Sequence, residues 1–243
     1  MANRFGPLPH PWEVTPAQAI AIQRKLSHHV VLADHFAEIN YVAGVDAGFE
    51  AAGKITRAAV AVLKFPELTL EEYFISRRPT SFPYVPGLLS FREAPAIIEA
   101  LENLNRLPDL IICDGQGIAH QRRFGIASHL GVITGLPAIG VAKNRLTGEH
   151  AELPPDKGSR VSLTDNGEVI GVVLRSRTGV KPIYISPGHK ICLKTSIHYV
   201  THCLTRFRLP ETTRWAHRLA SEINVSKPPE GPTPELMPDR GKE

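Results

Sequence analysis

The chain has 243 residues, of which 42% are hydrophobic and 21% are charged, and its formal net charge is +4. This apolar content and mild charge exclude a disordered chain, and the length suits one domain with a sizeable core. Three cysteines without a CxxC pair exclude a disulfide scaffold and a cysteine-bound zinc module. No apolar run approaches the roughly 18 residues of a membrane helix, and the first thirty residues lack a signal-peptide pattern. We therefore expect a cytoplasmic protein that makes no membrane contact.

The N-terminal part is predicted to form one helix followed by a three-stranded meander. Thr15 to Gln18 matches a capping box with Pro16 at the first helical position, which predicts a helix that extends to about His35. Short turns separate three strand-like runs, at residues 41–49, 55–65 and 70–77. Strands joined in this way predict an antiparallel meander at one edge of a mixed sheet.

The rest of the chain alternates helices with short apolar strands. A helical pattern covers residues 91–104, and we place its start near Pro95 because proline cannot donate a backbone hydrogen bond inside a helix. Further strands are predicted at 109–114, 137–142, 169–175 and 182–186, and further helices at 124–134, 192–205 and 211–224. These elements predict a single α/β domain with a mixed sheet over residues 1–225. Residues 226–243 are rich in proline and are predicted to be a disordered tail.

The charges are not evenly distributed along the chain. Residues 115–148 contain no acid and four cations, namely Arg122, Arg123, Lys143 and Arg145. Residues 169–210 again contain no acid, and their seven cations are Arg175, Arg177, Lys181, Lys190, Lys194, Arg206 and Arg208. Scattered basic residues usually only solvate a surface, but soluble surfaces normally mix the two signs. The two acid-free windows therefore favour nucleic acid or another polyphosphate as the partner.

Two aspartates occupy the same local setting. Asp46 ends the apolar run 42–45, and Asp114 ends the apolar run 110–113. Either one alone is compatible with an ordinary acid at the end of a strand. A carboxylate among the apolar residues of a central strand is costly to bury unless it is paired or holds a metal ion. If the two strands are neighbours, both side chains can enter one pocket, where they would repel each other without a cation.

Glu93 is a candidate third ligand, with an alternative structural role. Ser90 to Glu93 matches a capping box, whereas a helix that starts near Pro95 would leave Glu93 at its mouth. Three carboxylates, with no HExxH motif and no paired cysteines, favour Mg²⁺ or Mn²⁺ over zinc. Metal ions held by acids beside a basic groove suit the hydrolysis of phosphodiesters. The two hypotheses are a metal-dependent nuclease and a non-catalytic nucleic-acid-binding protein whose acids are structural.

An ordered set of motifs resembles endonuclease V, a family of deoxyinosine-directed repair nucleases with a ribonuclease-H-like fold. The matching segments are Val42–Asp46, Pro83–Glu93, Asp114–Gly117 with His120, Gly140–Asn144, Ser186–Lys190 and Pro210–His217. Together they span most of the chain, from about residue 40 to 220, and only the Pro-rich tail lies clearly outside them. The resemblance implies a ribonuclease-H-like mixed sheet flanked by helices.

The resemblance also implies roles for individual residues. Asp46, Glu93 and Asp114 match the metal-binding acids, while Lys143 and His217 match catalytic positions beside the scissile phosphate and the metals. Tyr84, in a turn stiffened by Pro83 and Pro86, matches an aromatic wedge that fills the gap left by a flipped base. The positions that match the pocket for this base are Gly87, Leu89, Gly115, His120, Gly125, Ile126 and Leu146. Ser186–Lys190, including His189 and Lys190, would form a loop that contacts backbone phosphates.

The function that the resemblance implies is magnesium-dependent DNA repair, with Mn²⁺ as a possible substitute for Mg²⁺. The enzyme would recognise DNA containing deoxyinosine or other deaminated bases. It would hydrolyse the second phosphodiester bond 3′ to the lesion and leave 3′-hydroxyl and 5′-phosphate ends. We expect a monomer, because no coiled-coil heptads are present. An inosine-directed ribonuclease remains an alternative, since the resemblance does not choose the sugar.

Overall fold

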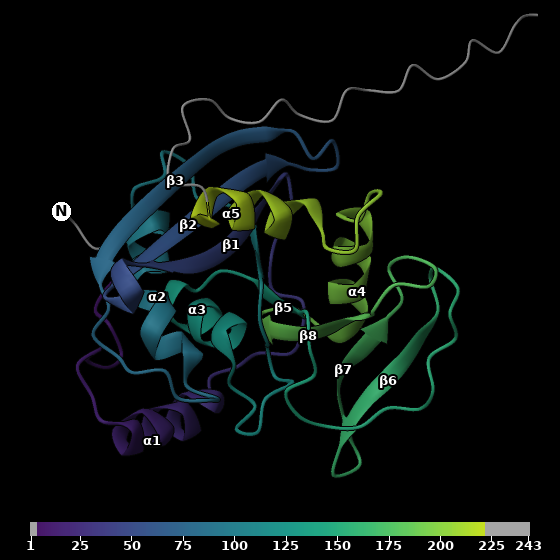
Figure 1. The fold of residues 1–243 in the computed structure, drawn as a ribbon, viewed down its shortest axis with the longest axis horizontal. Coiled ribbons are helices and arrows are strands. Elements are labelled where there is room, and N and C mark those ends of the chain that lie inside the picture. Colours follow the sequence, from purple (N-terminus) through teal and green to yellow (C-terminus); the bar gives the residue numbers. More distant parts are fainter. Residues whose placement is uncertain (1–3, 222–243) are drawn as a thin grey trace, which may run out of the picture.

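The structure, a computed structural model, describes residues 4–221 as one mixed sheet with helices on both faces (Figure 1). The strands are β1 (Tyr41–Glu50), β2 (Ile55–Lys64), β3 (Leu70–Pro79), β4 (Leu110–Cys113), β5 (Ala138–Ala142), β6 (Arg160–Asp165), β7 (Glu168–Leu174) and β8 (Ile183–His189). The helices are α1 (Pro16–Ser27), α2 (Leu89–Glu102), α3 (Ile126–Thr134), α4 (Leu193–His202) and α5 (Glu211–Ser221), and a short 3₁₀ turn covers Ala51–Gly53. The predicted tail, residues 226–243, lies outside the described part. No helix within residues 4–221 is long and apolar enough to cross a membrane.

The sheet has the order β3-β2-β1-β4-β5-β8-β7-β6. β1, β2 and β3 form the predicted antiparallel meander, and β3 is an edge strand. β1, β4 and β5 are parallel to one another, whereas β8, β7 and β6 continue the sheet in antiparallel fashion. The predicted α/β domain with a mixed sheet is thus confirmed.

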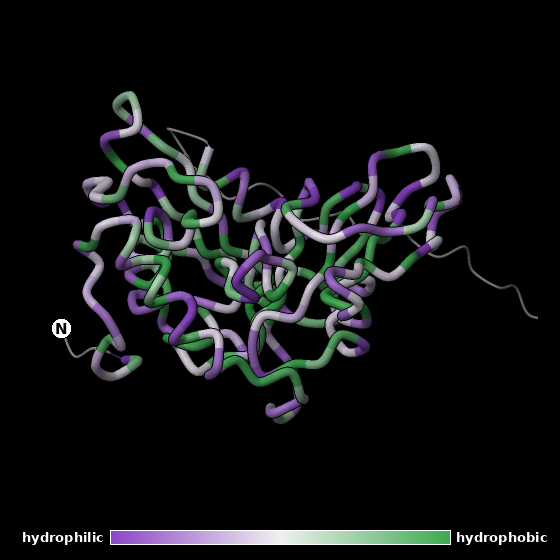
Figure 2. Tube along the Cα trace, turned by 90° about the horizontal axis from the view of Figure 1, so that it is seen from below, coloured by the Kyte–Doolittle hydropathy of each residue, from purple (hydrophilic) through white to green (hydrophobic). Residues whose placement is uncertain are grey.

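Helices cover both faces of the sheet, and each face has its own hydrophobic core. Side chains of β1 alternate between the faces, so that Val42 packs on the side of α5 while Ala43 and Val45 pack on the side of α2 and α3. Trp215 and Leu219 of α5 lie in the first core. In Figure 2 the apolar segments gather in the interior of the fold and the most hydrophilic ones lie largely at its rim.

Close contact between α5 and β1 depends on Gly44. A Cβ atom at this position would lie 1.8 Å from the backbone oxygen of Thr212, so only glycine permits the helix to approach this closely. The contact places α5 across β1 and β2, as Figure 1 shows. This helix therefore has a fixed position on the strand that carries Asp46.

Helix α1 is shorter than predicted. Its N-terminus has the predicted capping box, because Thr15 Oγ1 accepts from Gln18 N–H and the Gln18 side chain accepts from Thr15 N–H. The helix nevertheless ends at Ser27 and not near His35. Beyond it, the N–H of Val31 donates to His189 of β8, so this segment bonds to the sheet instead of continuing the helical pattern.

Helix α2 contradicts the predicted start near Pro95. It begins at Leu89, and Pro95 lies inside it. The buried face of α2, which includes Phe91, Ala94 and Ile97, compensates for the backbone hydrogen bond that proline cannot make. The proposed capping box is also absent: Ser90 and Glu93 both lie within the helix, and the N-cap is Leu88 without a side-chain bond.

Strand β6 was not predicted at all. It is the other edge of the sheet, and of its six residues only Leu163 is buried. Its residues do alternate between polar and apolar side chains, with Val161 and Leu163 as the apolar pair, and this alternation was the available signal.

Candidate active site

Asp46 and Asp114 lie side by side because β1 and β4 are parallel neighbours. The register pairs Val42 with Leu110 and Val45 with Cys113, so the two aspartates occupy the next position along both strands. The N–H of Asp114 donates to the backbone oxygen of Val45 at 3.3 Å. Since side chains alternate along a strand, both carboxylates point to the face covered by α5. The predicted pairing of the two acids in one place is therefore present.

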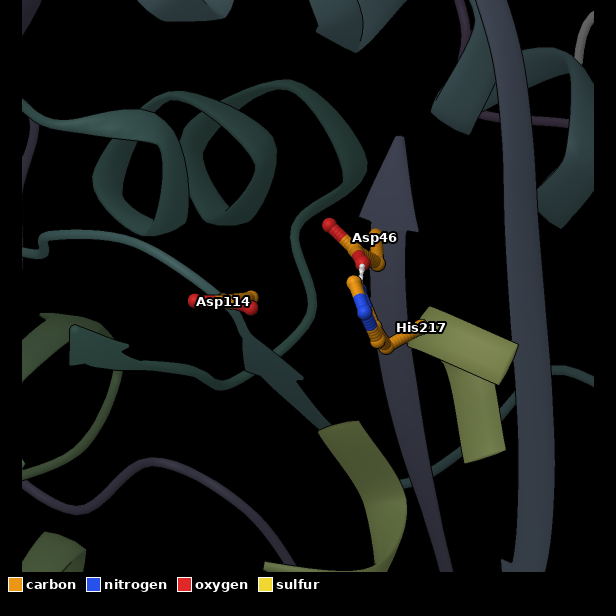
Figure 3. A group of neighbouring side chains, drawn as sticks. All are labelled: Asp46, Asp114 and His217. Atoms are coloured by element: carbon orange, nitrogen blue, oxygen red, sulfur yellow. Dashed lines mark hydrogen bonds and ion pairs between the residues drawn. The ribbon is translucent and has the colours of Figure 1, made fainter. Parts of the chain in front are cut away.

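His217 of α5 completes a cluster with these two acids (Figure 3). Its Nδ1 donates to Oδ2 of Asp46 at 2.7 Å, while Oδ1 of Asp46 accepts from the N–H of Ala47. One ligand atom from each of Asp46, Asp114 and His217 lies within 4.8 Å of the others. Two ligands of one Mg²⁺ ion lie at most about 4.2 Å apart, because each bond is about 2.1 Å long. Small side-chain rotations would therefore bring the three groups onto one ion.

The electrostatics of the cluster favour a cation. Burial and the nearby charge of Asp114 raise the pKa of Asp46, although His217 and Lys143 act in the opposite direction. Oδ2 of Asp114 is buried, and its one partner within residues 4–221 is the Nζ of Lys143 at 2.5 Å. Two carboxylates held this close repel each other, so a bound positive charge would stabilise the arrangement.

Glu93 reaches the same region from α2, on the opposite face of the sheet. Its side chain is buried, and this burial, together with the charges of Asp46 and Asp114, raises its pKa well above the ordinary value. Glu93 thus lies near both aspartates but outside the cluster that they form with His217. Since α2 begins at Leu89, Glu93 is neither a cap nor at the mouth of the helix; it is a buried acid of the first two helical turns, near both aspartates.

A cavity of about 350 Å³ opens next to the cluster, and Asp114 and Lys143 line part of it. Its size is within the range of about 300–1,000 Å³ that is usual for ligand pockets. All predicted nucleic-acid-binding positions except His189 and Lys190 line it: Tyr84, Pro86, Gly87, Leu89, Gly115, His120, Gly125, Ile126 and Leu146. The structure therefore brings together residues that the chain separates by more than sixty positions.

The rim of the cavity carries two exposed apolar side chains. Tyr84 is 73% exposed and Leu146 is 44% exposed, and both line the cavity. Burying such side chains against another molecule is favourable, so exposed apolar groups at a cavity mouth indicate a contact surface. Arg145, also exposed, adds a positive charge to this rim.

His120 is uncharged in the cavity wall. Burial is the main reason that its pKa falls to about 4, and Arg122 and Arg123 lower it further, while a bond to Gly87 opposes the shift. Nδ1 of His120 accepts from the N–H of Arg122 at 3.1 Å, so the proton is on Nε2, which donates to the backbone oxygen of Gly87 at 2.9 Å.

The predicted phosphate-contacting loop at Ser186–Lys190 is not a loop. The segment is the end of β8, in the interior of the sheet, and His189 is only 6% exposed. The Nζ of Lys190 donates to the backbone oxygen of Gly135 at 2.6 Å. This segment has a structural role: Ser186 and Pro187 accept hydrogen bonds from the N–H groups of Gly117 and Ile118, which follow Asp114 in the chain.

Other cavity residues were not identified from the sequence. Gln23 and Ser90 line the cavity, and both are buried. Gln23 lies on the buried face of α1 with Ala19 and Leu26. A polar residue at spacings of four and three from buried apolar ones was the available signal.

The sheet carries two carboxylates at adjacent positions of neighbouring parallel strands, next to an imidazole and to a cavity that Lys143 and Arg145 help to line. This arrangement fits the class of enzymes that hydrolyse phosphodiesters. Comparison with known proteins identifies the family within this class. The family model described as Endonuclease V matches residues 24–218. The chain therefore belongs to the endonuclease V family of nucleases.

Relatives and solved structures agree with this assignment. The chain is 61% identical to "Endonuclease V" of Rippkaea orientalis over 214 residues, which cover 86% of this chain and 93% of the relative. The structure of endonuclease V from Streptomyces avermitilis superposes with a TM-score of 0.82 at 40% identity, covering 88% of this chain and 94% of the other. Endonuclease V from Ciona intestinalis, in complex with a 23mer DNA containing an inosine followed by a ribo-adenosine, gives a TM-score of 0.73 at 26% identity and covers 85% and 97%.

Proposed function

We propose that this protein is a divalent-metal-dependent endonuclease that recognises deoxyinosine in DNA and cuts the strand on the 3′ side of the lesion. One observation carries the proposal: the cluster of Asp46, Asp114 and His217 lies beside a cavity with an exposed aromatic side chain at its rim. The Ciona relative, bound to inosine-containing DNA, supports the choice of ligand.

The donor set suits Mg²⁺, with Mn²⁺ as a substitute. Asp46 and Asp114 offer carboxylate oxygens, Glu93 approaches from the other face, and His217 adds one nitrogen. Hard cations prefer such oxygen ligands, and Mn²⁺ also accepts imidazole. A bound divalent ion would supply Lewis-acid activation of the phosphodiester.

The residues of this chain have separate jobs in the proposed reaction. The flipped base occupies the cavity, where neutral His120 and the backbone groups around Gly87 and Gly125 face it. Tyr84 occupies the gap in the duplex, since its ring is exposed and held between prolines. Lys143 donates to negative charge that develops on the phosphate. Because the base lies beside the cluster, the cut falls at a neighbouring linkage; we propose the second phosphodiester 3′ to the base, with 3′-hydroxyl and 5′-phosphate products.

The proposal is tested with an end-labelled duplex that contains one deoxyinosine. Wild type should cut it once in Mg²⁺ or Mn²⁺, at the second linkage on the 3′ side, and EDTA should abolish cutting. Asp46→Asn removes a ligand charge and should abolish cutting while lesion binding, measured in Ca²⁺, persists. Tyr84→Ala should instead weaken lesion binding. Without the ring in the gap of the duplex, the flipped base returns to the stack more easily.

Matched DNA and RNA substrates decide whether the enzyme prefers deoxyribose or ribose at the lesion. The same sequence with inosine in RNA should be cut more slowly than the DNA substrate. Faster cutting of RNA would favour the inosine-directed ribonuclease instead. Equal cutting by wild type and Asp46→Asn would contradict the assignment of the site, and metal-independent binding without any cutting would favour a nucleic-acid-binding protein.

A further inference from the structure

The backbone oxygen of Gly87 is the centre of a hydrogen-bond network under the cavity. It accepts from Nε2 of His120 at 2.9 Å, from Nη2 of Arg122 at 2.8 Å and from Nε2 of Gln23 at 3.0 Å. Gly87 has a φ of +77°, and a Cβ atom there would lie 2.6 Å from the Gln121 side chain. The peptide that follows the Pro-rich turn is therefore held from three directions.

Gln23 is the member of this network that bridges two walls of the cavity. It comes from α1, is 1% exposed, and lines the cavity itself. Its amide nitrogen donates to Gly87, on the wall formed by the Pro-rich turn, and to the backbone oxygen of Phe124, 3.2 Å away, next to a second wall. The residues that follow Phe124, namely Gly125 and Ile126, line that second wall. Gln23 thus bonds directly to both segments, and His120 and Arg122 also hold the Gly87 side.

The orientation of the Gln23 amide is fixed by its third bond. Its Oε1 accepts from Nε of Arg122 at 2.5 Å, so both N–H groups are directed at the two backbone oxygens. Every polar atom of the side chain is used. A glutamate of the same size would keep the bond to Arg122 but would place one acceptor oxygen against two carbonyl oxygens, and a methionine would make none of these bonds.

We infer that Gln23 is a positioning residue that sets the width of the base cavity and thereby the selectivity for the lesion base. The inference rests on the proposed function of the cavity. None of the bonds of Gln23 involves Asp46, Asp114 or His217, so its role is separate from the bond-breaking step. Purines that differ only at their edges are distinguished by hydrogen bonds whose donors and acceptors must be correctly spaced. A wall that moves would weaken this distinction first.

The test compares Gln23→Met and Gln23→Glu with wild type. The measured quantity is the ratio of cutting efficiencies for duplexes with deoxyinosine and with deoxyadenosine at one position. We expect this ratio to fall about tenfold in both variants, while the maximal single-turnover rate on deoxyinosine at saturating enzyme stays within about threefold of wild type. Arg122→Met removes the group that orients Gln23 and should lower the ratio in the same direction.

Gln18→Met is the matched control, because Gln18 is a glutamine of the same helix that serves only the exposed capping box. It should leave the ratio unchanged even if it lowers the melting temperature. The inference is overturned if Gln23→Glu keeps the wild-type ratio, or if the Gln23 variants lose stability and maximal rate at an unchanged ratio. A wild-type protein that does not prefer deoxyinosine would contradict the proposed function itself, which separates the two failures.

Discussion

Arg208 shows how a residue without direct access to the cluster can influence it. Its guanidinium donates to the backbone oxygens of Lys143, Pro182 and Lys181, at 2.6, 2.8 and 2.9 Å. It therefore joins the segment that carries Lys143 to the segment that precedes β8. Nζ of Lys143, in turn, lies 2.5 Å from Asp114. The position of this lysine thus depends on a cation that the sequence pattern indicated only as part of a basic window.

We predict that Arg208→Met slows cutting of deoxyinosine DNA about tenfold, because it releases the backbone of Lys143 and so displaces a group that stabilises the reacting phosphate. Lesion binding in Ca²⁺ should change much less. Arg208→Lys keeps the positive charge and one donating nitrogen, and it should restore part of the rate. Single-turnover rates measure the effect, and Arg206→Met, an exposed neighbour, is the control. Equal losses in both arginine variants would indicate a general charge effect.

At the scale of elements, a chain of neutral imidazoles joins the N-terminal segment to α2 and α3. His10 Nδ1 donates to the backbone oxygen of Pro11, so its Nε2 accepts from Nε2 of His129, and Nδ1 of His129 accepts from the hydroxyl of Ser90. Burial lowers the pKa of His10, and it lowers that of His129 well below the ordinary value. The hydrogen bond between the two Nε2 atoms holds one proton, so a second proton on the other nitrogen would break this bond.

This predicts a pH dependence of stability. Below pH 6.5 the unfolded chain binds a proton on His129 that the folded chain does not, so the free energy of unfolding falls as the pH is lowered from 7 to 5. In His129→Gln this slope should be smaller by up to about 1.4 kcal/mol per pH unit. Urea unfolding at pH 5, 6 and 7 measures both slopes. Parallel slopes in the two proteins would mean that His129 is protonated in the folded state.

The sequence could predict elements whose signals are local. The capping box at Thr15, the meander and the apolar runs that end in Asp46 and Asp114 are all patterns of a few residues. The start of α2 could not be predicted correctly, because its packing outweighs the missing hydrogen bond of Pro95. Likewise, the parallel pairing of β1 and β4 is a long-range contact. The sequence therefore predicted that the two aspartates share one pocket only if their strands are neighbours.

The site residues divide in the same way. Asp46 and Asp114 were identified from burial and charge, whereas His217, Lys143 and the cavity positions rested on the family resemblance. Gln23 was found by neither route, since two of its three partners are backbone atoms more than sixty residues away. The identity of the residues at these positions does not reveal such backbone contacts. The domain boundary at residue 225 stays a prediction.

For the whole molecule, the acid-free windows contain two kinds of cation. Arg122, Arg175, Lys190 and Arg208 donate to backbone oxygens, and Arg123 pairs with Asp165 and Glu168. These residues serve the fold. Other cations of the windows are exposed and form no ion pair within residues 4–221: Arg145, Arg177, Lys181, Lys194 and Arg206. These five exposed cations are therefore the candidates for contact with a polyanion.

We predict that Arg145→Gln and Lys181→Gln weaken DNA binding and reduce its salt dependence. Arg145 lines the cavity, and Arg208 ties the backbone of Lys181 to that of Lys143. Each lost phosphate contact should reduce the slope of log affinity against log salt concentration by about 0.9. Titrations between about 50 and 200 mM NaCl, a range over which affinities that depend on phosphate contacts fall steeply, measure the slopes. Lys64→Gln is the control, because Lys64 lies opposite Tyr41 in the strand register, at the start of β1 and before the position of Asp46. An unchanged slope in the Arg145 and Lys181 variants would exclude them from the interface.

The contact between Gly44 and Thr212 joins a segment from early in the chain to one from late in it, so the cluster can be completed only late in synthesis. Asp46 and Asp114 are made in the first half of the chain, but His217 arrives with α5, the last helix described. During synthesis the segments that carry the two acids therefore leave the ribosome before the helix that carries their third partner. A nascent chain does not hold the complete cluster, and any nuclease activity built on it begins only after nearly the whole chain has emerged.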